Sequence, residues 1–220
     1  MTDVLSQDEI NKLLAAVDSA AGGKSGSSAS DGRPKEIPQE KLRAISILHE
    51  DFARIACKSL SAQLHDTMKI DMGSICQLFL DEFIRSIPSP TVMGVISMEP
   101  LKGGIVLEID PAIAFAVIDR IHSGKRETKR QRHEMTDVEK IIMQGIFVGL
   151  SENLREAWSE TISLRPRFEK IETDPKFIRV APQKEGVVLV TLEARLGNAE
   201  GMINICIPHP VIEPIMDKFW

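Results

Sequence analysis

The sequence repeats itself, and this repeat constrains the fold more than any single motif does. The phrase FIRSIP begins at Phe83, and FIRVAP begins 94 residues later at Phe177. The apolar positions of the helical stretch before each phrase recur at the same step: Leu48, Phe52, Leu60 and Leu64, then Ile142, Ile146, Leu154 and Trp158. Further along, IDPAIAFAVIDRI (109–121) and IPHPVIEPIMDKF (207–219) match at a step of 98 residues. Three matches in the same order predict an internal duplication, with repeats at about 42–124 and 134–220.

Each repeat is expected to contain a long helix, three strands and a shorter helix. The strands are predicted in SICQLFLDEFIRSI (74–87), TVMGVISME (91–99) and GGIVLEI (103–109), and again in RFEKIETDPKFIRVA (167–181), GVVLVTLEARL (186–196) and GMINICI (201–207). LKGG (101–104) and RLGNAEG (195–201) are the predicted hairpin turns, and Pro111 opens a short helix. Strand meanders with helices at their ends indicate the α+β class. We therefore expect a pseudo-two-fold duplicated α/β sandwich in which the two long helices pack against the strands.

A separate amphipathic helix is predicted before the repeats, in LSQDEINKLLAAV (5–17). Ser6 and Glu9 form a capping box, and the apolar face comprises Ile10, Leu13, Leu14 and Val17. About 12 residues are marginal for an isolated helix, so it must dock on its own domain or on a partner. The Gly- and Ser-rich stretch that follows favours capture of a partner. We expect a docking helix at 1–18, a flexible linker at 19–36 and a folded domain at 37–220, with the N-terminal arm disordered.

Composition excludes several classes of function. The formal net charge of −5 argues against general nucleic-acid binding. The three cysteines are widely spaced and form no C-x-x-C, which indicates a reducing compartment rather than a disulfide framework. No apolar run approaches a membrane span, and the N-terminus lacks a signal-peptide core. We expect a cytosolic protein, without direct membrane insertion, that could be peripheral to a membrane-bound machine.

No motif for catalysis or metal binding emerges. The five histidines form no H-E-x-x-H, and GGKS (22–25) lacks the first glycine of a phosphate loop because Asp18 stands there. HED (49–51) is expected on the polar side of a helix whose apolar face is Leu48, Phe52 and Ile55. Cys206 is expected to fill the core, and the basic run 125–133 to be a solvated linker or to meet an acidic protein patch. We expect no catalytic residue, no metal and no cofactor.

Six stretches together carry a resemblance to a known family: VLSQDEINKLL (4–14), HEDFARIACKSLSAQL (49–64), DEFIRSIPSP (81–90), PAIAFAVIDRI (111–121), LREAWSE (154–160) and MINICIPHPVIEPI (202–215). They extend over nearly the whole chain, and the first and last are highly specific. The chain resembles the FliM family of flagellar motor switch proteins, which belongs to a superfamily with the CheC-type phosphatases. The resemblance implies a pseudo-symmetric α/β domain of the CheC-like type, in agreement with the duplication.

The resemblance also implies a function, partners and site residues. It implies a subunit of the cytoplasmic switch ring, at the cytoplasmic face of the inner membrane in the flagellar basal body. The subunit would bind the phosphorylated response regulator CheY, contact FliG and neighbouring FliM copies, and control the direction of rotation in chemotaxis. The CheY-binding residues would be Ser6, Asp8, Glu9, Ile10, Leu13 and Leu14. The FliG-binding residues would be Asp119, Arg120, Ser123, Gly124 and Lys125.

The sequence departs from the family pattern in two places. The family's Gly-Gly-x-Gly loop keeps only Gly124 here, with Ser123 and Arg126 at two other glycine positions. The family also continues into a FliN-like C-terminal domain, whereas this sequence stops at Trp220, so FliN would be bound only through that missing domain.

Two alternative functions can be compared with the leading one. A CheC-like phosphatase of phosphorylated CheY needs Glu and Asn three residues apart on a helix. The residues three positions before the four asparagines are Asp8, Leu150, Arg195 and Gly201, so we expect a protein that is not an enzyme. A scaffold without signal input would leave the N-terminal helix without a partner.

Overall fold

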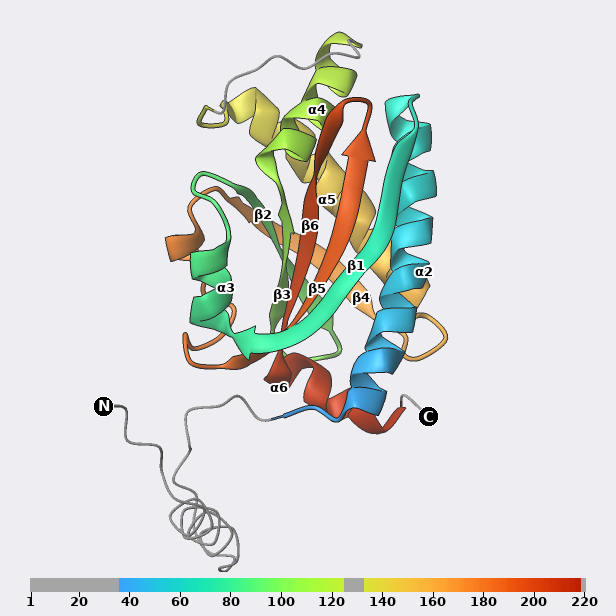
Figure 1. Cartoon of the computed structure of the whole chain (residues 1–220), viewed down its shortest axis with the longest axis vertical. Helices are drawn as coiled ribbons and strands as arrows, with labels where there is room; N and C mark the ends of the chain where they lie inside the picture. The colour runs from blue at the N-terminus through green and yellow to red at the C-terminus, as the bar shows by residue number, and fades with distance from the viewer. Residues whose placement is uncertain (1–35, 125–132, 219–220) are drawn as a thin grey trace, which may run out of the picture. The chain divides into compact units, whose positions relative to one another are not determined.

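The computed structural model describes residues 36–124 and 133–218 (Figure 1). The predicted docking helix, most of the predicted linker and the basic run up to residue 132 lie outside these ranges. None of the helices within them combines the length and the hydrophobicity that a bilayer crossing requires.

A six-stranded antiparallel sheet forms the centre of the domain, with the strand order β1-β5-β6-β3-β2-β4. Its strands are β1 (Met68–Phe79), β2 (Val92–Glu99), β3 (Gly104–Ile109), β4 (Arg165–Glu172), β5 (Gly186–Leu196) and β6 (Ala199–Pro208). The two repeats exchange their first strands, because β1 pairs with β5 and β4 pairs with β2. They meet where β3 pairs with β6. This symmetric order confirms the predicted pseudo-two-fold α/β architecture.

Helices cover the two faces of the sheet unequally. The long helices α2 (Gln39–Leu64) and α5 (Asp137–Trp158) pack on one face, the inner face, and share its core with α4 (Pro111–Ser123). The opposite, outer face carries α3 (Leu80–Ser86), the turn η1 (Pro175–Phe177) and a smaller apolar cluster. The short α6 (His209–Ile212) and η2 (Glu213–Lys218) close the chain.

The helix ends follow the local sequence. At the start of α5, the Thr136 hydroxyl accepts from the Glu139 N–H (3.3 Å), and the Thr136 N–H donates to the Glu139 carboxylate (2.8 Å). At the start of α4, Asp110 accepts from the N–H of Ala112 at 2.7 Å, and Pro111 occupies the first turn as predicted. These capping hydrogen bonds satisfy N–H groups that a helix start leaves without intrahelical partners.

The first predicted strand of each repeat was wrong in extent. The stretch 74–87 divides into the end of β1 and helix α3, where the Phe79 N–H donates to the Glu82 carboxylate at 2.7 Å. Leu80 and Phe83, one helical turn apart, then pack on the outer face. In the second repeat, β4 ends at Glu172 and the chain turns at η1. A short apolar run can form either a strand or a buried helix, and here a capping residue decides.

The placement of His49 on the polar side of its helix was also wrong. The side chain of His49 is fully buried in α2, and its ring lies 5.9 Å from that of Trp158 in an edge-on contact. Its Nδ1 lies 2.8 Å from the Ile45 carbonyl oxygen. Burial lowers the pKa of His49 to about 4, so this ring is a neutral member of the core.

Candidate functional site

The end of α4 holds the residues predicted to contact FliG. Asp119 and Arg120 are buried, and the Arg120 side chain, only 3% exposed, places its Nε 2.7 Å from an Asp66 carboxylate oxygen. A guanidinium removed from water requires such charge-assisted hydrogen bonds. In the isolated domain, these two residues therefore support the helix end from beneath.

Gly124 ends α4 in the left-handed conformation, with φ at 62°. Its N–H donates to the Arg120 carbonyl at 3.2 Å, which closes a turn over residues 120–124 that we call the Gly124 turn. A Cβ at this position would meet nothing within 4 Å, so glycine is favoured here by backbone conformation and not by crowding. Gly124 is exposed, Ser123 is the last residue of α4, and Lys125 lies outside the described residues.

Sequence reasoning missed other members of this surface. Ile121 and His122 are exposed on the last turn of α4, beside Gly124. Ile121 continues the apolar pattern of α4, and the helix end leaves it uncovered. Asp66 was missed because no local pattern links it to Arg120, which lies 54 positions away. The six residues predicted to bind CheY, from Ser6 to Leu14, lie outside the described residues.

A second surface is an apolar stripe on the outside of α5. Val138, Ile141 and Val148 are exposed, Ile141 to 68%. Gly145 lies between them on the same face, and a Cβ there would meet nothing within 4 Å. Large exposed apolar side chains at helical spacing are typical of surfaces that another protein covers.

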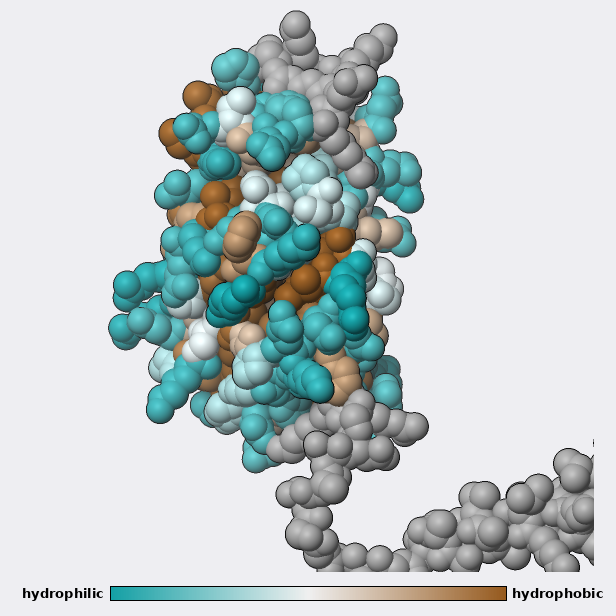
Figure 2. Space-filling model, turned by 90° about the vertical axis from the view of Figure 1, so that its left-hand side faces the viewer, coloured by the Kyte–Doolittle hydropathy of each residue, from teal (hydrophilic) through white to brown (hydrophobic). Residues whose placement is uncertain are grey.

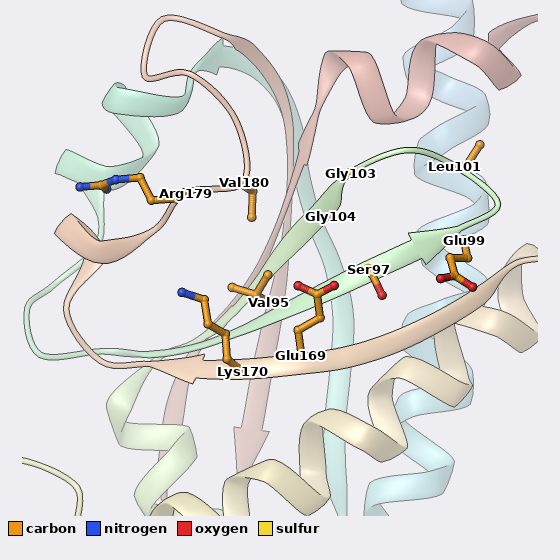
Figure 3. A pocket seen from close by; sticks show the side chains of 10 residues that line it. All are labelled: Val95, Ser97, Glu99, Leu101, Gly103, Gly104, Glu169, Lys170, Arg179 and Val180. Carbon is orange, nitrogen blue, oxygen red and sulfur yellow. The ribbon is translucent and has the colours of Figure 1, made fainter.

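A hollow of about 410 Å³ lies on the outer face, between the β2–β3 hairpin and the segment after η1 (Figure 3). Glu169 and Lys170 both point into it, because a bulge in the β2–β4 pairing falls at this level and interrupts the alternation of side chains. The side of the domain that carries α3 shows hydrophobic surface among hydrophilic side chains (Figure 2). Lys170 is already paired with Glu172 at 2.7 Å. The hollow thus offers a mixed lining and no convergent set of catalytic groups.

Buried polar groups on the outer face form a structural network. The Thr91 hydroxyl donates to the Glu108 carboxylate, and the Asn204 amide donates to its other oxygen at 2.8 Å. The Asn204–Glu108 bond crosses the seam between β6 and β3, and Thr191 of β5 donates to Asn204 at 2.8 Å, which extends the network within the second repeat. Burial raises the pKa of Glu108. Because these groups are occupied with one another, the network stabilises the sheet and presents no reactive atom.

Titratable residues form no evident metal centre within residues 36–124 and 133–218: no group of three or more His, Cys, Asp or Glu there could hold an ion. The prediction that Cys206 fills the core is confirmed, since it is fully buried and burial raises the pKa of its thiol. All three cysteines are free thiols.

The fold first defines a broad class. FliY of Thermotoga maritima superposes with a TM-score of 0.72 at 17% identity, covering 84% of this chain and 98% of that one. A CheC-like superfamily protein of Shewanella gives 0.50 at 9% identity over 77% and 98% of the two chains. These similarities show a CheC-like fold. The family model of flagellar motor switch protein FliM then matches residues 38–220, and the chain belongs to the FliM family.

Individual relatives agree with this assignment. The chain is 45% identical to the FliM of Treponema pallidum, over 100% of this chain and 68% of that protein. It is 39% identical to the FliM of Borreliella burgdorferi, over 97% and 66%. The chain thus spans about two thirds of the length of these relatives. A solved FliG–FliM complex from H. pylori matches with a TM-score of 0.79 at 34% identity, over 82% of this chain and 100% of that one.

Proposed function

We propose that this protein is a non-enzymatic subunit of the flagellar motor switch, acting at the cytoplasmic face of the inner membrane. It takes its signal from phosphorylated CheY and passes it to FliG, which biases the direction of rotation. The observation that carries the proposal is the FliM family match over residues 38–220, on a domain whose α4 ends in an exposed glycine turn. In this proposal FliN binds only through the further C-terminal domain that the sequence resemblance implies.

The Gly124 turn is the proposed contact with FliG. The support is the relative solved as a FliG–FliM complex, together with the exposure of Ile121, His122 and Gly124 at one helix end. Gly124→Ala places a side chain on a backbone with φ at 62°, which favours rearrangement of the turn. We expect weaker binding of purified FliG in calorimetric titration.

Gly103→Ala is the matched control for the FliG titration. Gly103 also has a positive φ, 107°, but it lies in the β2–β3 hairpin, at the opposite end of β3 from α4. Equal losses of FliG affinity in the two variants would contradict the assignment of the contact to the Gly124 turn.

The N-terminal segment is the proposed contact with phosphorylated CheY. In this proposal Ile10, Leu13 and Leu14 enter an apolar groove, while Ser6 caps the helix and the acidic Asp8 and Glu9 meet basic groups at the rim. Leu13→Ala should weaken binding by about 1–3 kcal/mol because a buried anchor is lost. Lys12→Ala is the control, since Lys12 lies off the apolar face. Loss of binding with Lys12→Ala but not with Leu13→Ala would contradict this face assignment.

The apolar stripe on α5 is the proposed contact with neighbouring copies in the ring. Exposed Val138, Ile141 and Val148 supply apolar area, and the bare backbone at Gly145 allows another element to approach closely. Burial of such side chains stabilises association. Sedimentation of the chain at increasing concentration tests this contact.

The non-enzymatic part of the proposal concerns phosphatase activity. The CheC-type enzymes share the fold, but this sequence has no Glu three residues before an Asn. Asn153 is buried in the long helix α5, and the residue three positions before it is Leu150, where the phosphatase motif has Glu. Catalytic amounts of the protein should leave the dephosphorylation rate of CheY unchanged, and a clear acceleration would overturn this part of the proposal.

A further inference from the structure

We infer that Asp66 is a positioning residue for the Gly124 turn and thereby for the binding of FliG. The inference rests on the proposed function, because FliG is the partner that reads the turn. It assigns a role to a residue that lies on another helix end and that need not touch the partner. The Asp66 carboxylate connects the end of α2 to the last turn of α4.

The Gly124 turn is anchored through Arg120. The backbone carbonyl of Arg120 accepts from the Gly124 N–H at 3.2 Å, so the glycine follows the arginine backbone. The Arg120 side chain is buried, and its Nε donates to Asp66 Oδ2 at 2.7 Å. A charge-assisted hydrogen bond to a buried guanidinium has a narrow range of favourable geometry, which fixes the rotation of the last helical turn.

Asp66 is itself held in place by the end of α2. His65 ends the helix with φ at 48°, and the Asp66 N–H donates to the Ser61 carbonyl at 3.3 Å. The other oxygen of the carboxylate, Oδ1, accepts from the Thr67 N–H at 2.8 Å. The two oxygens therefore have different donors, one on its own loop and one on α4. In an asparagine, an NH2 group, which donates and does not accept, replaces one of the two oxygens, so one of the two donors loses its acceptor.

The exposed part of the turn depends on this connection. Ile121 and His122 follow Arg120 directly and are exposed, so a rotation about the helix axis at Arg120 would move both. A partner binds only the fraction of molecules whose turn is in place, and the apparent Kd rises as that fraction falls. If loss of the Asp66 contact leaves the turn in place in about one molecule in ten, FliG binding weakens about tenfold.

The test uses the full chain and compares two aspartates, Asp51 in α2 and Asp66 just after the end of α2. Asp66→Asn should weaken the binding of purified FliG about tenfold in calorimetric titration. Asp51→Asn is the matched control, because Asp51 also pairs with an arginine, Arg54 at 2.6 Å, but on the exposed side of α2. It should change the affinity less than about twofold. Wild-type affinity in Asp66→Asn would overturn the inference.

Two further readouts separate positioning from a general loss of stability. In a double-mutant cycle, Asp66→Asn should reduce the FliG affinity of Gly124→Ala only slightly, because the turn is already displaced in that variant. Full additivity of the two losses of affinity would contradict the proposed route. Amide hydrogen exchange over residues 120–124 in free Asp66→Asn should speed up about tenfold, with the rest of the sheet unchanged. Unchanged exchange would overturn the inference even if FliG failed to bind the wild-type chain. That failure would refute only the proposed contact with FliG.

Discussion

The two repeats of this domain differ most where they face outward. Phe83 and Phe177 occupy the same place in the repeated phrase, yet Phe83, in α3, is fully buried and Phe177, in η1, is 60% exposed. The first repeat ends in the 13-residue helix α4 and the Gly124 turn, whereas the second ends in the short α6 and η2. The comparison indicates that packing keeps the shared sheet and long helices similar, while the outer surface is free to specialise.

The core itself contains a compensating exchange between the repeats. In β2, a Cβ on Gly94 would lie 2.5 Å from the Phe147 ring of α5. In the other repeat, Val188 corresponds to Gly94 and Ala53 corresponds to Phe147. Val188, Ala53 and Phe147 all belong to one buried cluster. One repeat thus pairs a small strand residue with a large helix residue, and the other pairs a larger strand residue with a small helix residue.

The strongest test of this exchange is Gly94→Val. The added side chain has no room beside Phe147, so the free energy of unfolding should fall by about 3 kcal/mol or more. Phe147→Ala alone should cost about 3–5 kcal/mol because it leaves a cavity. The double variant Gly94→Val/Phe147→Ala has the residue pair of the other repeat. Its loss in free energy of unfolding, measured with urea, should be smaller than the sum of the losses in the two single variants. Simple additivity would show that the two sites do not compensate.

A second difference between the repeats is His49, whose counterpart is Met143. The folded-state pKa of His49 is about 4, below the usual value of 6.5 for the unfolded chain. As the pH falls from 6.5 to 4, the unfolded chain binds a proton that the folded protein excludes, so stability should fall by up to about 3 kcal/mol. Glu108, with its raised pKa, binds a proton more readily in the folded state and offsets part of this loss.

The substitution His49→Met places in the first repeat the residue found at the corresponding position of the second, and it removes the titrating group. The free energy of unfolding should then depend less on pH between about pH 7 and 4.5 than it does in the wild type. Chemical denaturation of both proteins at the two pH values measures the difference. An identical loss in both would show that His49 is not the source of the pH dependence.

The sequence predicted the elements that depend on periodic patterns. The duplication, the long helices, the hairpin turns and the helix start at Pro111 all agree with the structure. Residues that depend on long-range contacts could not be predicted in this way. The α3 helix follows from an unusual cap at Phe79, the burial of His49 from its contact with Trp158, and the role of Asp66 from a partner on another helix. Of the predicted FliG contacts, Gly124 lies on the surface, while Asp119 and Arg120 lie beneath it.

A smaller effect is expected on the outer sides of the long helices. Ile47 of α2 and Ile141 of α5 occupy corresponding positions, and both are exposed. Asp51 and Arg54 form an ion pair next to Ile47, whereas Gly145 and Val148 flank Ile141. Ile141→Ser should therefore weaken self-association by about 1–2 kcal/mol, and Ile47→Ser by less. Sedimentation equilibrium measures both, and a larger loss with Ile47→Ser would reverse the assignment of the ring contact to α5.

The central claim, that the chain receives a phosphorylation signal, is tested most directly by titrating a labelled peptide of residues 1–17 with CheY. Three apolar side chains in a groove give a gross gain on the order of 5–9 kcal/mol, much of which is lost in ordering the peptide. The account predicts reversible binding on the order of micromolar to phosphorylated CheY, and clearly weaker binding to the unphosphorylated form. Equal affinity for the two forms, or no binding to either, would contradict it.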